Sequence, residues 1–130
     1  MERTINIDGK EVRLRASAAI PRLYRLKFKR DILVDMKLIQ EALLKSGYDG
    51  SEETAASSLP IDVLTLFENA AYLMARHADP ESVPDSVDEW LDGFETFSIY
   101  KVFPVIRDLW SANLLTLSKP KKKQRRRTGR

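Results

Sequence analysis

Side chains able to do chemistry are few in this chain of 130 residues. It has one histidine, His77, and no cysteine. A zinc site draws several ligands from His, Cys and carboxylate side chains, and a hydrolytic triad needs a serine and a carboxylate beside its histidine. No such set can be assembled around His77, so we interpret it as a structural residue near a helix C-terminus, where the helix dipole mildly favours a protonated imidazole. We expect no enzyme, no metal ion and no cofactor.

Acidic residues gather between positions 85 and 95 and raise the question of a cation site. Their spacing is not that of a calcium loop, which needs a central glycine and a closing glutamate. Several of them fall in or before a predicted first helical turn, where negative charge is favourable without any ion. We interpret the group as a solvated face that consists of Asp85, Asp88, Glu89, Asp92 and Glu95.

Aromatic side chains are dense between positions 90 and 110. The simplest interpretation is core packing between two consecutive helices, and the alternative is a groove for a partner helix, because aromatic residues also anchor interfaces. Phe97 and Tyr100 fall at the junction of the two predicted helices and are the best candidates for exposed anchors. The candidate partner-binding residues are Trp90, Phe94, Phe97, Tyr100 and Phe103.

The net charge of +3 hides three blocks. Residues 1–47 carry 11 basic and 6 acidic side chains, whereas residues 48–118 carry 3 basic and 13 acidic ones. Residues 119–130 hold eight Lys or Arg and no acid. Such a run attracts polyanions, but it lacks interleaved aromatics on which bases could stack, so we expect only non-specific binding of nucleic acid. The candidate polyanion-binding residues are Lys121, Lys122, Lys123, Arg125, Arg126 and Arg127.

The elements that position these side chains begin with a short β-hairpin. Residues 4–8 and 11–15 alternate apolar and polar positions around Asp8-Gly9, which is a strong signal for a two-residue turn. The hairpin must pack on helices, because two strands alone are only marginally stable. Its predicted buried side consists of Ile5, Ile7, Val12 and Leu14.

Two helices are predicted to follow the hairpin. The first covers about residues 18–28, with Ser17 as its N-cap. The second covers about residues 31–45, and small, polar and acidic residues predict a loop over 46–58. The apolar stripe of the second helix consists of Ile32, Met36, Ile39 and Leu43.

Three more helices are predicted in the second half. One starts near Leu59-Pro60 and runs to about residue 78. A short one follows a capping box that begins at Ser86, and its apolar face extends to Phe94. The last covers about residues 96–117. The stripe predicted for residues 59–78 consists of Val63, Leu66, Phe67, Ala70, Met74 and His77.

We therefore predict a mainly α fold, with a short N-terminal β-hairpin followed by a bundle of about five helices. Residues 1–118 would form a single α-rich domain, and residues 119–130 a disordered basic tail that has nothing apolar to bury beyond a proline. No apolar run reaches the roughly 18 residues of a membrane span, and the start of the chain is polar and charged, so we expect a cytosolic protein.

Three segments together resemble a known family. They are residues 5–32 (INIDGKEVRLRASAAIPRLYRLKFKRDI), residues 67–80 with Phe67-Glu68-Asn69-Ala70-Ala71-Tyr72 and then Met74 to Pro80, and residues 84–110 (PDSVDEWLDGFETFSIYKVFPVIRDLW). In this order they resemble the tail assembly chaperones of long-tailed, siphovirus-type bacteriophages and of prophages, chiefly from Gram-positive hosts. The resemblance covers about residues 4–117 and rests on the joint order of the segments.

The resemblance implies a binding protein that acts in the host bacterial cytoplasm. Members bind the tape measure protein, keep it soluble and help to recruit tail tube subunits around it, and they are absent from the finished virion. They are not enzymes. Many self-associate, so a homo-oligomer is implied, and the family is often made in two lengths, the longer one by programmed ribosomal frameshifting.

Two alternatives stay open beside this interpretation. The basic residues 119–130 do not match a pattern of the family, and a small nucleic-acid-associated phage protein acting through them is the first alternative. The acidic body of the chain disfavours it. The second alternative is a small regulatory or structural phage protein with the same helical fold and no chaperone role.

Overall fold

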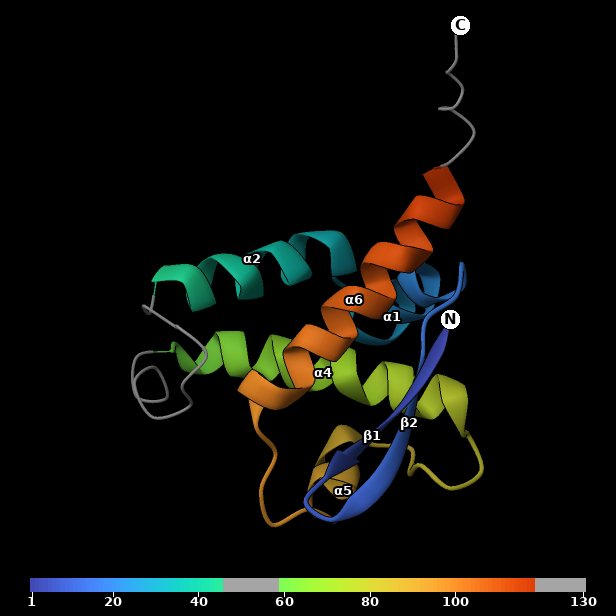
Figure 1. The fold of residues 1–130 in the computed structure, drawn as a ribbon, viewed down its shortest axis with the longest axis vertical. Helices are drawn as coiled ribbons and strands as arrows, with labels where there is room; N and C mark the ends of the chain where they lie inside the picture. The colour runs from blue at the N-terminus through green and yellow to red at the C-terminus, as the bar shows by residue number, and fades with distance from the viewer. Residues whose placement is uncertain (46–58, 119–130) are drawn as a thin grey trace, which may run out of the picture.

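The computed structural model describes residues 1–45 and 59–118, with side chains as far as residue 112. Within these ranges the chain is mainly helical, with five helices and one N-terminal antiparallel hairpin (Figure 1), so the predicted fold class is confirmed. The predictions for residues 46–58 and 119–130 lie outside the described residues. The elements are β1 (Glu2–Ile7), β2 (Lys10–Arg15), α1 (Ile20–Phe28), α2 (Ile32–Lys45), α4 (Ile61–Ala78), α5 (Val87–Leu91) and α6 (Ile99–Ser118).

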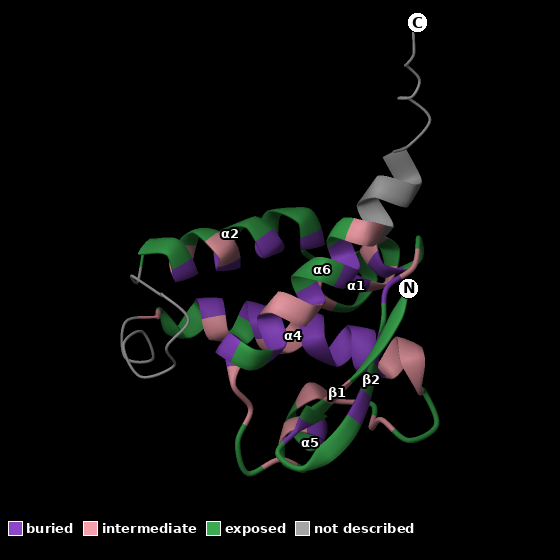
Figure 2. Ribbon diagram, viewed as in Figure 1, coloured by how far each residue is buried: buried purple, intermediate pink, exposed green. Residues whose placement is uncertain are grey.

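Helix α4 lies at the centre of the fold. It contacts β2, α1, α2, α5 and α6, and Figure 2 shows buried residues along much of its length. Because neighbours cover it from several sides, its apolar surface is wider than the single stripe predicted. His77 of that stripe is only half-buried. The buried residues of α4 are Val63, Leu66, Phe67, Ala70, Ala71, Tyr72, Leu73, Met74 and Ala75.

The hairpin has the predicted turn and the predicted buried side. Asp8 and Gly9 both have positive φ, 56° and 78°, as a two-residue type I′ turn requires. The Asn6 side-chain oxygen accepts a hydrogen bond from the Gly9 N–H at 3.0 Å. The hairpin packs on α4 through β2 and on α6 through β1. The predicted buried side is confirmed for three of its four residues, Ile7, Val12 and Leu14, whereas Ile5 is half-buried.

Helix α1 begins at Ile20, two residues later than predicted, and its N-cap is Ala19 rather than Ser17. With Ser17 as the cap, Pro21 would occupy the first position whose N–H must donate within the helix, and proline has no N–H. The observed start places Pro21 in the first turn, where no donor is needed. Ser17 instead accepts a hydrogen bond from the Ala19 N–H through its hydroxyl oxygen, at 3.2 Å.

Helix α2 buries the predicted stripe in full. Asp31, expected as its first residue, precedes it and accepts a hydrogen bond from the Leu33 N–H at 2.8 Å, as an N-cap side chain does. Helix α4 begins at Ile61 with Pro60 as its N-cap, one or two residues later than the predicted start near Leu59-Pro60. The buried stripe of α2 consists of Ile32, Met36, Ile39 and Leu43.

The chain between α5 and α6 is longer than predicted. The Ser86 hydroxyl caps α5 by accepting from the Glu89 N–H at 3.1 Å, which confirms that cap. Helix α5 nevertheless ends at Leu91 and α6 starts only at Ile99, so the prediction of helical structure through Phe94 and from residue 96 was wrong. The physical reason lies in the hairpin, because Asp8 accepts hydrogen bonds from the Glu95 N–H and the Thr96 hydroxyl, at 2.7 and 3.3 Å.

Candidate functional site

Three of the five candidate aromatic residues, Trp90, Phe94 and Phe97, form a cluster around Trp90. Its ring centroid lies 5.3 Å from those of Phe94 and Phe97 and 5.8 Å from that of Tyr72. The Phe97 ring lies 5.2 Å from the Phe67 ring. Helix α4 therefore supplies Phe67 and Tyr72 to a group that the sequence pattern assigned to two consecutive helices alone.

Burial separates the five candidates into two sets. Trp90, Tyr100 and Phe103 are buried, with 6%, 9% and 1% of their surface exposed, whereas Phe94 and Phe97 are half-buried. Tyr100 is therefore not the expected exposed anchor, because it lies in the first turn of α6 on a side that faces the core. The part of these side chains in binding a partner stays a prediction.

A shallow hollow lies beside the cluster. Its volume is about 310 Å³, and it joins the start of α4 to the residues that lead into α6. Such a hollow has room for small apolar side chains of a partner. It is lined by Leu59, Leu64, Thr96, Phe97, Ser98, Ile99 and Tyr100.

Exposed aliphatic side chains occur on the two helices nearest the N-terminus. Leu26 on α1 is 55% exposed. On α2 four aliphatic side chains are exposed, and Figure 2 shows exposed residues along the side of this helix that faces away from α4. We call these four residues the α2 outer face; they are Leu33, Val34, Leu38 and Leu44.

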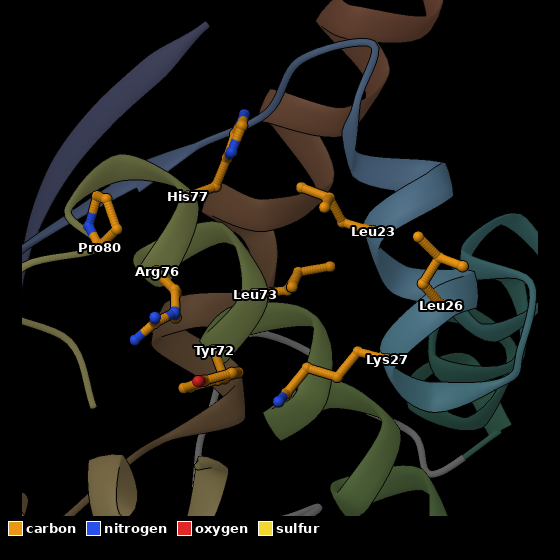
Figure 3. A pocket seen from close by; sticks show the side chains of 8 residues that line it. All are labelled: Leu23, Leu26, Lys27, Tyr72, Leu73, Arg76, His77 and Pro80. Atoms are coloured by element: carbon orange, nitrogen blue, oxygen red, sulfur yellow. The ribbon is translucent and has the colours of Figure 1, made fainter. Parts of the chain in front are cut away.

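A larger groove runs between α1 and α4, with a volume of about 440 Å³ (Figure 3). Leu23 and Leu26 extend into it from α1, and Leu73 lies on its floor. We call it the α1–α4 groove. Its lining is apolar along most of its length and carries basic side chains at its margin. The lining residues are Leu23, Leu26, Lys27, Tyr72, Leu73, Arg76, His77 and Pro80.

Two cations meet at one end of the α1–α4 groove. Lys27 Nζ lies 5.6 Å from the centroid of the Tyr72 ring and donates to the Asp85 carbonyl at 3.4 Å. Arg76 donates to the Val83 carbonyl at 2.7 Å, and its other terminal nitrogen lies 3.2 Å from the Asp85 carboxylate. Burial raises the pKa of the Tyr72 hydroxyl. This end of the groove therefore combines an aromatic face with two positive charges.

His77 lies in the same groove as a neutral residue. Burial, followed by the nearby Arg15 and the N-terminal ammonium, lowers the pKa of its imidazole. Its Nε2 lies 2.8 Å from the Ser17 hydroxyl oxygen. The expectation that the helix dipole would favour the protonated form was wrong, because desolvation and neighbouring positive charges outweigh it.

Acidification should therefore cost this protein stability through His77. The pKa of His77 in the folded protein lies below the value near 6.5 of an unfolded chain. The stability that its neutral imidazole contributes is therefore complete above about pH 6.5, and it is lost as the pH falls through the folded pKa. The His77→Gln variant should lose less melting temperature than the parent between about pH 7.5 and about pH 5. Thermal denaturation followed by circular dichroism measures both. An equal or larger loss in the variant would show that His77 is not the group that titrates.

The α1–α4 groove was missed by the sequence pattern. Tyr72, Leu73 and Arg76 lie outside the predicted α4 stripe, and Leu26 lies in a helix whose surface is otherwise basic. The available signal was an excess of apolar residues on α4 beyond one stripe, which indicates a second covered or hollowed side.

The candidate polyanion-binding residues lie outside the described residues, namely Lys121, Lys122, Lys123, Arg125, Arg126 and Arg127.

Comparison of the chain with models of protein families, with curated proteins and with solved structures finds no match. In the described ranges no three His, Asp or Glu side chains form a group that could hold a metal ion. None of the helices described is long and apolar enough to cross a membrane.

Three surfaces described above are suited in shape and apolar lining to bind a partner. They are the α2 outer face, the α1–α4 groove and the hollow beside Phe97.

Proposed function

We propose that this chain is a tail assembly chaperone of long-tailed, siphovirus-type bacteriophages or prophages. It binds the tape measure protein in the host bacterial cytoplasm, keeps it soluble and helps to recruit tail tube subunits around it. It catalyses no reaction and is absent from the mature virion. Two things support the proposal: the resemblance over about residues 4–117, and apolar surface on α1 and α2 that no part of the described chain covers.

The observation that carries the proposal is a surface helix whose exposed side holds four aliphatic side chains among its charged ones, Lys37, Glu41 and Lys45. Helix α2 turns one complete stripe into the core, and its α2 outer face exposes four further aliphatic side chains, with Leu33 48% and Leu44 68% exposed. A surface helix of a globular protein normally presents polar residues on its outer side. Exposed apolar patches instead mark sites of interaction with a partner.

A helical client suits this surface. The resemblance implies a long, largely helical tape measure protein, and amphipathic helices expose apolar stripes until another protein encloses them. Laying such a stripe along the α2 outer face would remove apolar surface of both proteins from water. Transfer to the tail needs no nucleotide if the contacts with tube subunits are tighter, because mass action then releases the chaperone.

Co-expression with the cognate tape measure protein tests this function. The parent chain should raise the soluble fraction of the tape measure protein, measured by quantitative gel analysis of cleared lysate. A Leu33→Gln, Leu38→Gln double variant should lose most of that effect. Both positions are exposed and glutamine is a good helix former, so each change should alter stability by no more than about 0.5 kcal/mol.

Two further variants locate the site. Ile61→Gln removes an aliphatic side chain that is 83% exposed at the start of α4, and it should protect the tape measure protein as well as the parent does. The pair Phe97→Ala, Tyr100→Ala tests the aromatic candidates, and a selective loss in that folded variant would move the site to the hollow beside Phe97.

The proposed function is wrong if the tape measure protein is equally soluble with and without this chain. The nucleic-acid alternative makes a different prediction, because it places the activity in residues 119–130. If the chain has no effect on the tape measure protein while nucleic acid is retained by the parent and lost by a variant ending at Ser118, that alternative is favoured.

A further inference from the structure

The α1–α4 groove differs from the α2 outer face because it combines apolar lining with paired positive charges. We propose that it binds an acidic amphipathic helix, with an aliphatic side chain on the groove floor and a neighbouring carboxylate between Lys27 and Arg76. This inference rests on the proposed function and deepens it, since it states the chemistry of the client segment that the chaperone selects.

The apolar part of the groove suits an aliphatic side chain. Leu23 and Leu26 extend into it from α1, and Leu73 is buried beneath them on α4 (Figure 3). Leu26 is 55% exposed, so the described chain leaves much of this wall in contact with water. The volume of about 440 Å³ lies within the range of about 300–1,000 Å³ that is usual for binding pockets.

At the charged end of the groove, Arg76 is already paired with a carboxylate of the chain itself. Asp85 lies 3.2 Å from Arg76, and its carbonyl accepts a hydrogen bond from Lys27. The Asp85 side chain is 88% exposed, and ion pairs so open to solvent contribute little. A client carboxylate can therefore take the place of Asp85 at Arg76 when apolar contacts hold the client in the groove.

The charged residues that line the groove favour an acidic client over a basic or neutral one. The depressed pKa of His77 keeps its imidazole neutral at pH 7, so the positive charge comes from Lys27 and Arg76. Asp79, near the other end, lies 3.9 Å from Arg13 and is partly compensated by it. Displacing Asp85 leaves two cations beside the Tyr72 ring, which is the arrangement that attracts a carboxylate flanked by apolar side chains.

A matched pair of peptides tests the proposal. The first is a capped, alanine-based helical peptide with leucines at i and i+4 and glutamates at i+3 and i+7, and the second carries glutamine in place of each glutamate. Fluorescence anisotropy with the full chain should give about fivefold or tighter binding of the glutamate peptide at low salt, and a smaller preference at about 0.5 M salt.

Three variants assign that preference to the groove. Lys27→Gln should reduce the preference for the glutamate peptide, because it removes one of the two cations that would flank the client carboxylate. Leu26→Gln should weaken both peptides equally, and Ile61→Gln, at an exposed aliphatic site on the far end of α4, should change neither. Asp85→Asn should tighten the glutamate peptide by about two- to fivefold and leave the glutamine peptide unchanged.

Equal affinity of the parent for the two peptides, or no measurable binding of the glutamate peptide, overturns the proposal. It is also overturned if Asp85→Asn leaves the preference unchanged. If light scattering shows that self-association competes with the peptide and Leu26→Gln abolishes it, the occupant is a second copy of the chain. These outcomes are separate from the co-expression result, since the chain can solubilise the tape measure protein without preferring acidic helices.

Discussion

Replacing Trp110 with alanine should lower the free energy of unfolding by about 3–5 kcal/mol. Trp110 lies on α6 with only 4% of its surface exposed, and it belongs to the same core cluster as Phe103 and Ile106 of that helix. Removing the indole leaves a cavity among side chains drawn from several elements, which can collapse only in part. Urea denaturation followed by circular dichroism measures the loss.

Trp110→Phe is the matched control for this prediction. The indole Nε1 has no hydrogen-bond partner in the described part of the chain, so its burial is already unfavourable by the cost of desolvating that N–H. Phenylalanine keeps most of the apolar volume and removes the unsatisfied donor, so the expected loss is below about 1.5 kcal/mol. If alanine also costs less than about 1.5 kcal/mol, Trp110 is not packed in the core. A folded alanine variant that fails only to solubilise the tape measure protein would place Trp110 at the client.

Local sequence patterns predicted an element well where its conformation depends on a single turn or on packing against one neighbouring element. Asp8-Gly9 is such a case, because both residues must adopt positive φ in a two-residue turn. The buried stripe of α2 is another, since a helix packed along one side needs one apolar stripe. The Ser86 cap depends only on an N–H three residues away.

The boundaries that were wrong depend on partners far along the chain. Thr96 was expected to begin the last helix, yet its hydroxyl and the preceding N–H are held by Asp8. Lys10 contributes to the same contact by donating to the Gly93 carbonyl. No local pattern contains these hydrogen bonds, because they join the hairpin turn to a segment more than eighty residues later.

The candidate site was harder to predict than the fold for a related reason. A periodic pattern identifies which side chains are apolar, but burial depends on which of them meet a neighbour. The density around Trp90 indicated either a core or a groove, and contacts with Phe67 and Tyr72 of α4 place much of it in the core. The α2 outer face can be read in the sequence as Leu33, Val34 and Leu38 beside the buried stripe, since these are more aliphatic residues than one covered side of a helix needs.

One buried charge near α1 joins three segments and carries the last prediction. Asp35 on α2 is 1% exposed. It accepts a hydrogen bond from the Tyr24 hydroxyl of α1 at 2.7 Å. Arg30, between the helices, binds it with two nitrogens, Nε at 2.8 Å from Oδ2 and Nη2 at 2.7 Å from Oδ1. Burial, and then the bond to Asp35, raises the pKa of Tyr24, so its hydroxyl stays a donor throughout the ordinary pH range.

Asp35→Ala should cost about 2–3 kcal/mol of unfolding free energy, because it leaves the buried Tyr24 hydroxyl without its acceptor, whereas the Arg30 side chain, 46% exposed, can turn to water. Tyr24→Phe is the control that keeps the ion pair and removes one neutral donor, and it should cost about 1 kcal/mol. Denaturant unfolding measures both, and Asp35→Asn should fall between them because the amide still accepts from one donor. Since only the Asp35 member of the ion pair is buried, the order of the three losses is the test. If Asp35→Ala costs no more than Tyr24→Phe, the carboxylate does not hold α1 against α2. The relative position of Leu26 and the α2 outer face would then be set by the apolar contacts of both helices with α4.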